Sequence, residues 1–165
     1  MYTHVCYSRR MDGNITIRKA VIDDCDRLME LMKELAKHEN EIDLMQLSPE
    51  DLRRDGFGEK PHFGCVVAEL TNSEHEKTII GYALYFNTYS PKVGKCIYME
   101  DIYVQPEYRR KRVANNSGCY RLHWGCLEWN RTAMEFYKRQ NAVDVTNPDH
   151  HIFHIDQPEL AKNFN

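Results

Sequence analysis

Two adjacent carboxylates, Glu100 and Asp101, interrupt a run of strand-forming residues that extends from Ile97 to Val104. Apolar residues on both faces of this run predict a central strand that is covered from both sides. A carboxylate in a buried strand is costly unless it is hydrogen-bonded, paired with a charge or facing a cleft. The pair therefore indicates a site, where burial would raise a carboxyl pKa and suit it to proton transfer. A structural, hydrogen-bonded role is the alternative.

A basic loop follows this strand after Pro106 and contains the run Arg109-Arg-Lys-Arg112. Such side chains can face a phosphate group, remain solvated or form a nuclear-localisation patch. A run of four is a weak localisation signal, so we favour the phosphate-facing or solvated role.

Three histidines, His150, His151 and His154, lie near the C-terminus. On an alternating strand His150 and His154 would share one face while His151 points away. Because no further Cys, His, Asp or Glu stands at clear ligand spacing, we predict no metal site.

The elements that would position these residues follow from hydrophobic spacing and turn signals. Residues 15–18 alternate as a strand does, and Asp23 or Asp24 can cap a helix whose apolar stripe runs from Cys25 to Ala36. Ser48, a first-turn proline and Asp51 predict a second helix that ends near Gly56. Strands at 63–70, 79–88 and 95–104 follow, with links short enough for an antiparallel meander.

The C-terminal part predicts a strand at 119–128 and a helix capped by Asn130, with Ala133, Phe136 and Tyr137 inward. Two last strands are expected at 143–145 and 150–155, and Pro158 opens a short terminal helix.

Length and composition limit the classes of protein. A chain of 165 residues fits one domain, and a net charge of -3 with a pI near 6.2 argues against nucleic-acid or membrane-surface binding. The six cysteines form no C-x-x-C pair, and the N-terminus lacks a signal peptide's apolar core, so we expect reduced thiols in the cytoplasm. The apolar runs are too short for a membrane helix.

The pattern aromatic-x-Glu-Asp-Ile-Tyr-Val-x-Pro-Glu-Tyr-Arg at 98–109 resembles the start of the acetyl-CoA motif of GCN5-related N-acetyltransferases. Segments at 33–39, 55–61, 128–130 and 136–139 resemble the diamine and thialysine branch and fall in its order, so the resemblance covers about residues 15–155. It implies an α/β fold with a mixed central sheet flanked by helices. Residues 1–13 would be an N-terminal extension to an acetyltransferase domain at 14–165.

The resemblance also implies site residues. Tyr137 would protonate the departing thiolate, and Glu100 would draw the proton from the amine through a water molecule. The substrate-binding positions would be Glu39, Ser90, Glu100 and Asp101. The cofactor-binding positions would be Ile102, Val104, Arg109, Arg110, Lys111, Arg112, Val113, Ala114, Asn130 and Tyr137.

Several of these positions have ordinary alternatives. Tyr137 could equally fill the core side of its helix, Asn130 is a natural N-cap, and Glu39 alone would read as a solvated helix end. Lys92 departs from the branch pattern and would repel a cationic substrate at short range.

The cofactor loop departs most from the family. Arg112 replaces the central glycine of Arg/Gln-x-x-Gly-x-Gly/Ala, and most of the crossover helix expected before the strand at Cys119 is missing. An extended chain can still cross back. Losing about four buried apolar side chains at ~1.5–3 kcal/mol each would, however, cost ~6–12 kcal/mol, which rivals a domain's whole stability.

The resemblance implies acetyl-CoA-dependent N-acetylation of a small primary amine such as thialysine, a diamine or a polyamine, by a homodimer that uses no metal. The alternative is a catalytically silent relative that acts as a dimerising or partner-binding module. The intact Tyr137, Glu100 and Asn130 favour the enzyme, whereas the altered loop favours the silent relative.

Overall fold

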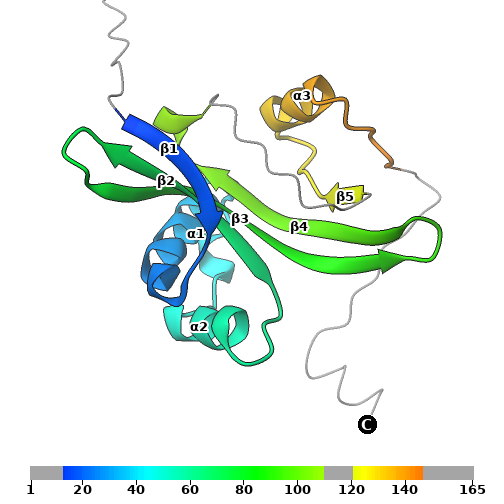
Figure 1. Ribbon diagram of the computed structural model, residues 1–165. Coiled ribbons are helices and arrows are strands. Elements are labelled where there is room, and N and C mark those ends of the chain that lie inside the picture. Colours follow the sequence, from blue (N-terminus) through cyan, green and yellow to red (C-terminus); the bar gives the residue numbers. More distant parts are fainter. Residues whose placement is uncertain (1–12, 110–120, 147–165) are drawn as a thin grey trace, which may run out of the picture. The chain divides into compact units, whose positions relative to one another are not determined.

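The computed structural model describes residues 13–109 and 121–146 (Figure 1). The chain divides after Gly125 into two compact units, residues 1–125 and residues 126–165. Within the described ranges, no helix is long and apolar enough to span a bilayer.

The first unit is built on a five-stranded sheet in the order β1-β2-β3-β4-β5. Strands β1 to β4 are antiparallel neighbours, whereas β5 runs parallel to β4. The strands are β1 (Gly13–Lys19), β2 (Gly64–Asn72), β3 (Lys77–Ser90), β4 (Gly94–Val104) and β5 (Arg121–Trp124). This mixed sheet with flanking helices confirms the predicted α/β class and the predicted meander. The connection predicted to contain a truncated crossover helix lies mostly at 110–120, outside the described residues.

Helices α1 (Cys25–Glu39) and α2 (Pro49–Phe57) lie on one face of the sheet (Figure 1). The predicted stripe of α1 forms the core, in which Leu28, Leu31 and Val67 are almost fully buried. Short 3₁₀ turns occur at Ile22–Asp24, Ile42–Leu44 and Pro106–Tyr108. Helix α2 begins as predicted: the Ser48 hydroxyl accepts from the Asp51 backbone N–H at 3.2 Å, and the Asp51 carboxylate accepts from the Ser48 N–H at 3.0 Å.

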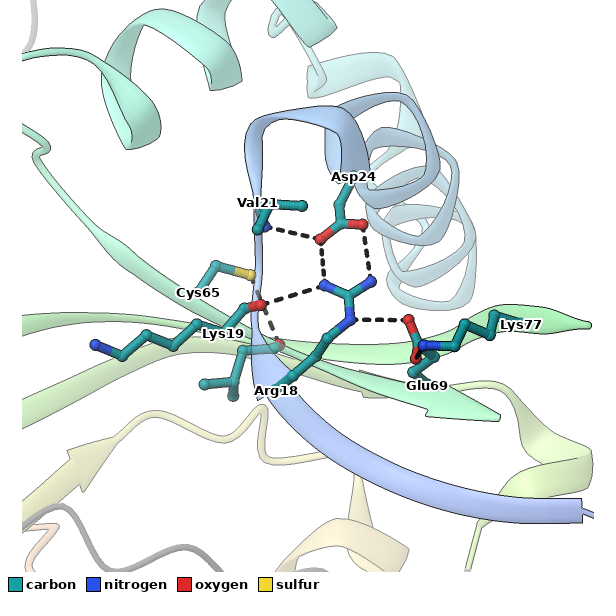
Figure 2. A network of polar contacts seen from close by, with 8 residues as sticks. Arg18, Lys19, Val21, Asp24, Cys65, Glu69 and Lys77 are labelled. Atoms are coloured by element: carbon teal, nitrogen blue, oxygen red, sulfur yellow. Dashed lines mark hydrogen bonds and ion pairs between the residues drawn. The ribbon is translucent and has the colours of Figure 1, made fainter. Parts of the chain in front are cut away.

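An ion-pair cluster ties β1 to β2 and to the start of α1 (Figure 2). Arg18 donates to both carboxylate oxygens of Asp24, at 2.7 and 3.0 Å, and to Glu69 at 2.8 Å, while Lys77 lies 3.0 Å from Glu69. Asp24 is the N-cap residue of α1, which confirms the predicted position, but its side chain makes no capping hydrogen bond to the helix. Its carboxylate instead accepts from Arg18 and from the Val21 backbone N–H.

The second unit contains helix α3 (Arg131–Arg139), which Asn130 caps by accepting a hydrogen bond from the Ala133 N–H at 3.2 Å. This cap confirms the prediction, and Ala133 and Tyr137 are half-buried. Phe136 is 48% exposed, so its predicted inward placement is wrong. Residues 143–145 form no strand, because Val143 and Val145 are exposed and no described strand pairs with them. The strand at 150–155 and the helix after Pro158 lie outside the described residues.

Candidate active site

A β-bulge at Glu100 organises the site. Leu84 of β3 pairs with Asp101 of β4, and the next pair joins Tyr85 to Met99, so that Glu100 is the extra residue on β4. In a regular strand Glu100 and Asp101 would point to opposite faces. A bulge bends the strand and can re-aim a side chain, which explains how both residues line the same cavity.

This cavity, which we call the acidic cavity, has a volume of about 400 Å³. Its walls come from α1, α2, the segment that enters β2, and the middle of β3 and β4. Apolar side chains supply about half of the lining and ionisable ones the rest: Met32, Leu47, Leu52, Phe63 and Leu84, with Asp51, Asp55, His62, Glu100 and Asp101. Four carboxylates at an apolar pocket favour a ligand that carries positive charge.

Asp101 is the partly buried carboxylate of the bulge pair. Burial raises its pKa, and a hydrogen bond from the Tyr82 hydroxyl, Oη to Oδ2 at 3.0 Å, opposes that rise. Tyr82 is 3% exposed, and burial together with the nearby Asp101 charge raises its own pKa, so it stays a proton donor. At the end of α1, Glu39 is half-buried, and burial and the charge of Asp101 both raise its pKa.

Asp51 and Asp55 reach the cavity from α2. The guanidinium of Arg54 binds both carboxylates at 2.7 Å, and it contributes to holding their pKa values below the usual range. The Ser48 bonds are the larger cause for Asp51. His62 donates its backbone N–H to the Asp55 carbonyl at 2.8 Å, which fixes this histidine beside α2.

Glu100 lines the cavity but is exposed, so its predicted burial is wrong, and Asp101 is the more buried of the two carboxylates. Ser90 lies at the far end of β3, six residues beyond Leu84, or about 20 Å along an extended strand. Its hydroxyl accepts from the Lys92 backbone N–H at 3.2 Å in the hairpin turn. The fold thus does not bring Ser90 to the acidic cavity.

The end of β4 has an open edge and is a second candidate region. The parallel pairing of β4 with β5 stops at Met99 and Trp124, one residue before the bulge. Strand β5 therefore ends before residue 128, the predicted end, while the predicted start at 119 lies outside the described residues. Residues 100–104 therefore have no strand partner on that side within the described ranges, and Ile102 is 46% exposed. An open strand edge can hydrogen-bond an extended ligand that contains amide groups.

Polar contacts hold this end of β4 in place. Tyr103 and Gln105 donate to the Glu34 carboxylate of α1 at 3.1 Å. Arg109 donates from Nε to the Val104 carbonyl at 2.8 Å, and its guanidinium lies 5.7 Å from the centre of the Tyr103 ring. The remaining predicted loop positions, 110–114, lie outside the described residues.

Tyr137 and Asn130 belong to the second unit, where both lie on or beside α3. Tyr137 is half-buried, and burial raises the pKa of its hydroxyl, which keeps the phenol protonated near neutral pH. Asn130 uses its side-chain oxygen for the helix cap.

Sequence reasoning missed Tyr82, His62 and the two aspartates of α2 as parts of one site. Asp51 and Asp55 stand four residues apart on a helix, a spacing that places both on one face. That signal could have been found. The bond from Tyr82 to Asp101 joins residues 19 apart and depends on the sheet register, which the sequence did not reveal.

Comparison with known proteins gives a consistent picture. The sequence profile of the acetyltransferase (GNAT) family matches residues 26–142. The thialysine N-epsilon-acetyltransferase of Bos taurus is 40% identical over 146 residues, covering 80% of this chain and 86% of that protein. Spermidine/spermine N(1)-acetyltransferase-like protein 1 of Homo sapiens is 34% identical over 158 residues, covering 87% of this chain but 23% of that longer protein.

Solved structures share the fold. An aminoglycoside N-acetyltransferase in complex with CoA superimposes with a TM-score of 0.60 at 15% identity, covering 90% of this chain and 98% of the other. An aminoglycoside acetyltransferase from a soil metagenomic sample gives a TM-score of 0.64 at 14% identity, covering 86% and 97%. At these identities the likeness concerns the fold alone.

Proposed function

Since this chain belongs to the acetyltransferase (GNAT) family, we propose that it transfers the acetyl group of acetyl-CoA to a primary amine of a small cationic substrate. Thialysine and diamines are the favoured classes, because relatives at 38–40% identity are thialysine N-epsilon-acetyltransferases. The acidic cavity is the observation that carries this proposal, since its four carboxylates and apolar walls suit a short carbon chain with an ammonium group at its end.

The four carboxylates of the cavity differ in whether a cation of the protein already pairs with them. Arg54 offsets part of the charge of Asp51 and Asp55. Glu100 and Asp101 make no ion pair within the described residues, so they are the carboxylates available to a cationic ligand.

Acetyl transfer needs a neutral amine, an electrophilic carbonyl and a protonated leaving group. Acetyl-CoA supplies the thioester carbonyl. Glu100 accepts the proton that the attacking amine loses, directly or through a water molecule. Tyr137 gives its phenolic proton to the thiolate sulfur as the C–S bond breaks, and solvent restores that proton. Burial raises the pKa of the Tyr137 hydroxyl, so the phenol holds its proton at neutral pH and has it available for the thiolate.

One feature of the described residues suits the binding of CoA, namely the open edge of β4. The open edge of β4 at residues 100–104 offers backbone donors and acceptors beside the exposed Ile102. Val104, Asn130 and Arg109 are further proposed contacts. Arg109 already spends its Nε donor on Val104, so its remaining N–H groups would face the phosphates. Arg110, Lys111, Arg112, Val113 and Ala114 are proposed to continue this contact.

The test measures CoA thiol released from acetyl-CoA in the presence of thialysine, lysine, 1,3-diaminopropane and spermidine. We expect release with at least one cationic amine and none with an amine-free control. Tyr137→Phe should lower kcat at least tenfold and leave acetyl-CoA affinity nearly unchanged, because only the thiolate's proton donor is removed.

Absence of release with every amine would contradict the proposal and favour the catalytically silent relative. As the macromolecular partner we propose a second copy of this chain, because the branch that the sequence resembles is dimeric. Sedimentation at micromolar concentration reads the assembly state directly.

A further inference from the structure

We propose that Tyr82 is a positioning residue for Asp101, which it holds in the acidic cavity as the anion that receives the substrate's ammonium group. This inference rests on the proposed function and adds to it a residue that has no place in the expected set of site residues.

Sheet register brings the two side chains together. Tyr82 lies opposite Tyr103, and Leu84 lies opposite Asp101, so Tyr82 and Asp101 are diagonal neighbours across β3 and β4. Diagonal neighbours are within reach of long aromatic side chains. The bulge at Glu100 follows directly beyond the Leu84–Asp101 pair and leaves this diagonal intact.

The hydrogen bond leaves one carboxylate oxygen for a ligand. Tyr82 Oη donates to Oδ2 of Asp101 at 3.0 Å, whereas Oδ1 has no hydrogen-bond partner among residues 13–109 and 121–146. No buried side-chain oxygen in those ranges lacks a partner, so Oδ1 is accessible. Because Asp101 lines the acidic cavity, this oxygen is available to an ammonium donor there.

Tyr82 also protects the charge of Asp101. Burial disfavours the carboxylate form of Asp101. A hydrogen bond donated to the carboxylate favours the charged form and opposes the effect of burial. The other acidic groups around Asp101 are Glu39 of α1, whose pKa the charge of Asp101 raises, and Glu100 of β4 with Asp51 and Asp55 of α2, which line the same cavity. Without the Tyr82 hydroxyl, Asp101 would take up a proton at a higher pH and lose its attraction for a cation.

The experiment titrates thialysine into the protein by calorimetry from about pH 5.5 to about pH 8.5, without acetyl-CoA. His62 lines the same cavity, so the whole series is made in a His62→Gln background and no histidine lines the cavity in any of the proteins compared. The variants are Tyr82→Phe, Asp101→Asn and the two together. Phenylalanine fills the same space as tyrosine, and thermal unfolding checks that each variant folds.

Tyr103→Phe is the matched control. Tyr103 is also buried in the sheet and also donates to a carboxylate, that of Glu34, but neither residue lines the acidic cavity. A general effect of losing a buried tyrosine–carboxylate bond would appear equally in this variant.

We expect thialysine affinity to fall on the acid side in the parent protein and to fall at a higher pH in Tyr82→Phe, with about tenfold weaker binding at mildly acid pH. Asp101→Asn should weaken binding at every pH, and adding Tyr82→Phe to it should cause no further loss. Tyr103→Phe should leave the pH dependence where it is.

The inference would be overturned if Tyr82→Phe bound thialysine as tightly as the parent protein and lost affinity at the same acid pH. It would also be overturned if the double variant bound more weakly than Asp101→Asn by the full loss seen in Tyr82→Phe. Absence of thialysine binding by the parent protein at all pH values would also overturn it. Because the titration needs no turnover, it separates this inference from the proposed function: failure of acetyl transfer with intact, Tyr82-dependent binding contradicts only the latter.

Discussion

Asp101 lies opposite Leu84 across β3 and β4, whereas its neighbour Glu100 has no partner on β3. This single extra residue lets two consecutive carboxylates line one cavity while they differ in burial, Glu100 exposed and Asp101 half-buried. The difference suits two tasks: a solvated carboxylate can pass protons to water, whereas a buried one binds a cation more strongly.

Glu100→Gln should therefore lower kcat by about tenfold or more and change KM for the amine less, because proton acceptance is lost while Asp101 still binds the cation. Steady-state kinetics with thialysine measure both constants. Glu74→Gln, which changes an exposed glutamate in the β2–β3 turn, is the matched control and should leave both constants unchanged. An equal kcat in Glu100→Gln and Glu74→Gln would remove Glu100 from the proposed chemistry.

Glu39→Gln should raise KM for a cationic amine more than it lowers kcat. Glu39 senses the charge of Asp101, which places its carboxylate within electrostatic range of the proposed ammonium position. Its pKa is raised, so its negative charge is lost earlier than usual as the pH falls. The KM difference between the two proteins should thus narrow on the acid side. If Glu39→Gln leaves KM unchanged at every pH, Glu39 is only a solvated helix end.

The sheet and helices were largely predictable because local signals agreed with one another. Ser48 and Asp51 form the capping box that their spacing indicates, and the apolar stripe of α1 is the core. The errors arose where tertiary contacts compete with local preference. The Asp24 side chain could have accepted a capping hydrogen bond from α1, but Arg18 provides a stronger, charged partner.

The site was predictable in part, from residues that are unusual in their own element. Glu100 and Asp101 stood out as charges within an apolar strand. The sequence did not indicate that the two differ in burial, because this difference depends on a one-residue shift in register between β3 and β4. Nothing in the sequence distinguishes Tyr82 from any other core aromatic residue, because the contact of its hydroxyl with Asp101 depends on the same register.

Arg18→Met should destabilise the fold by about 1–3 kcal/mol near neutral pH, because it leaves Asp24 and Glu69 without their shared cation. Arg18 is partly exposed, with 32% of its side chain accessible, so the full cost of breaking a buried pair is not expected. Denaturant unfolding measures the difference. Arg53→Met, which removes ion pairs to the exposed Asp26 and Glu50, is the control and should cost less.

The stability lost in Arg18→Met should depend on pH in one direction. Burial alone would raise the pKa of Asp24, but bonds from Arg18 and the Val21 N–H outweigh it, and Arg18 and Lys77 lower the pKa of Glu69. Carboxyl groups with lowered pKa values stabilise the fold above their ordinary values of 3.8 and 4.5, and this stability is lost as the pH falls below them. The difference in unfolding free energy between the wild type and Arg18→Met should therefore disappear in acid. A difference that stays constant with pH would show that the ion pairs of Arg18 are not its cause.

Acetyl-CoA binding should be measurable but weak, and it should fall steeply as salt rises from low to physiological concentration. In the family loop, glycines allow backbone N–H groups to approach the pyrophosphate at a helix N-terminus. Here Arg110, Lys111 and Arg112 offer side-chain charge in place of the glycine-bearing pattern. Contacts of this kind are screened by salt and require flexible side chains to be ordered.

Two variants separate the causes of this weakness. Arg112→Gly alone should help little, because the sequence still lacks most of the helix that would anchor the backbone donors. A family-like helix inserted between Ala114 and Gly118 should restore much of the affinity and flatten the salt dependence. Calorimetry across a salt series compares both variants with the unmodified chain and with the Bos taurus relative as the reference. Tight, salt-insensitive binding by the unmodified chain would show that the basic loop is sufficient without glycine or helix.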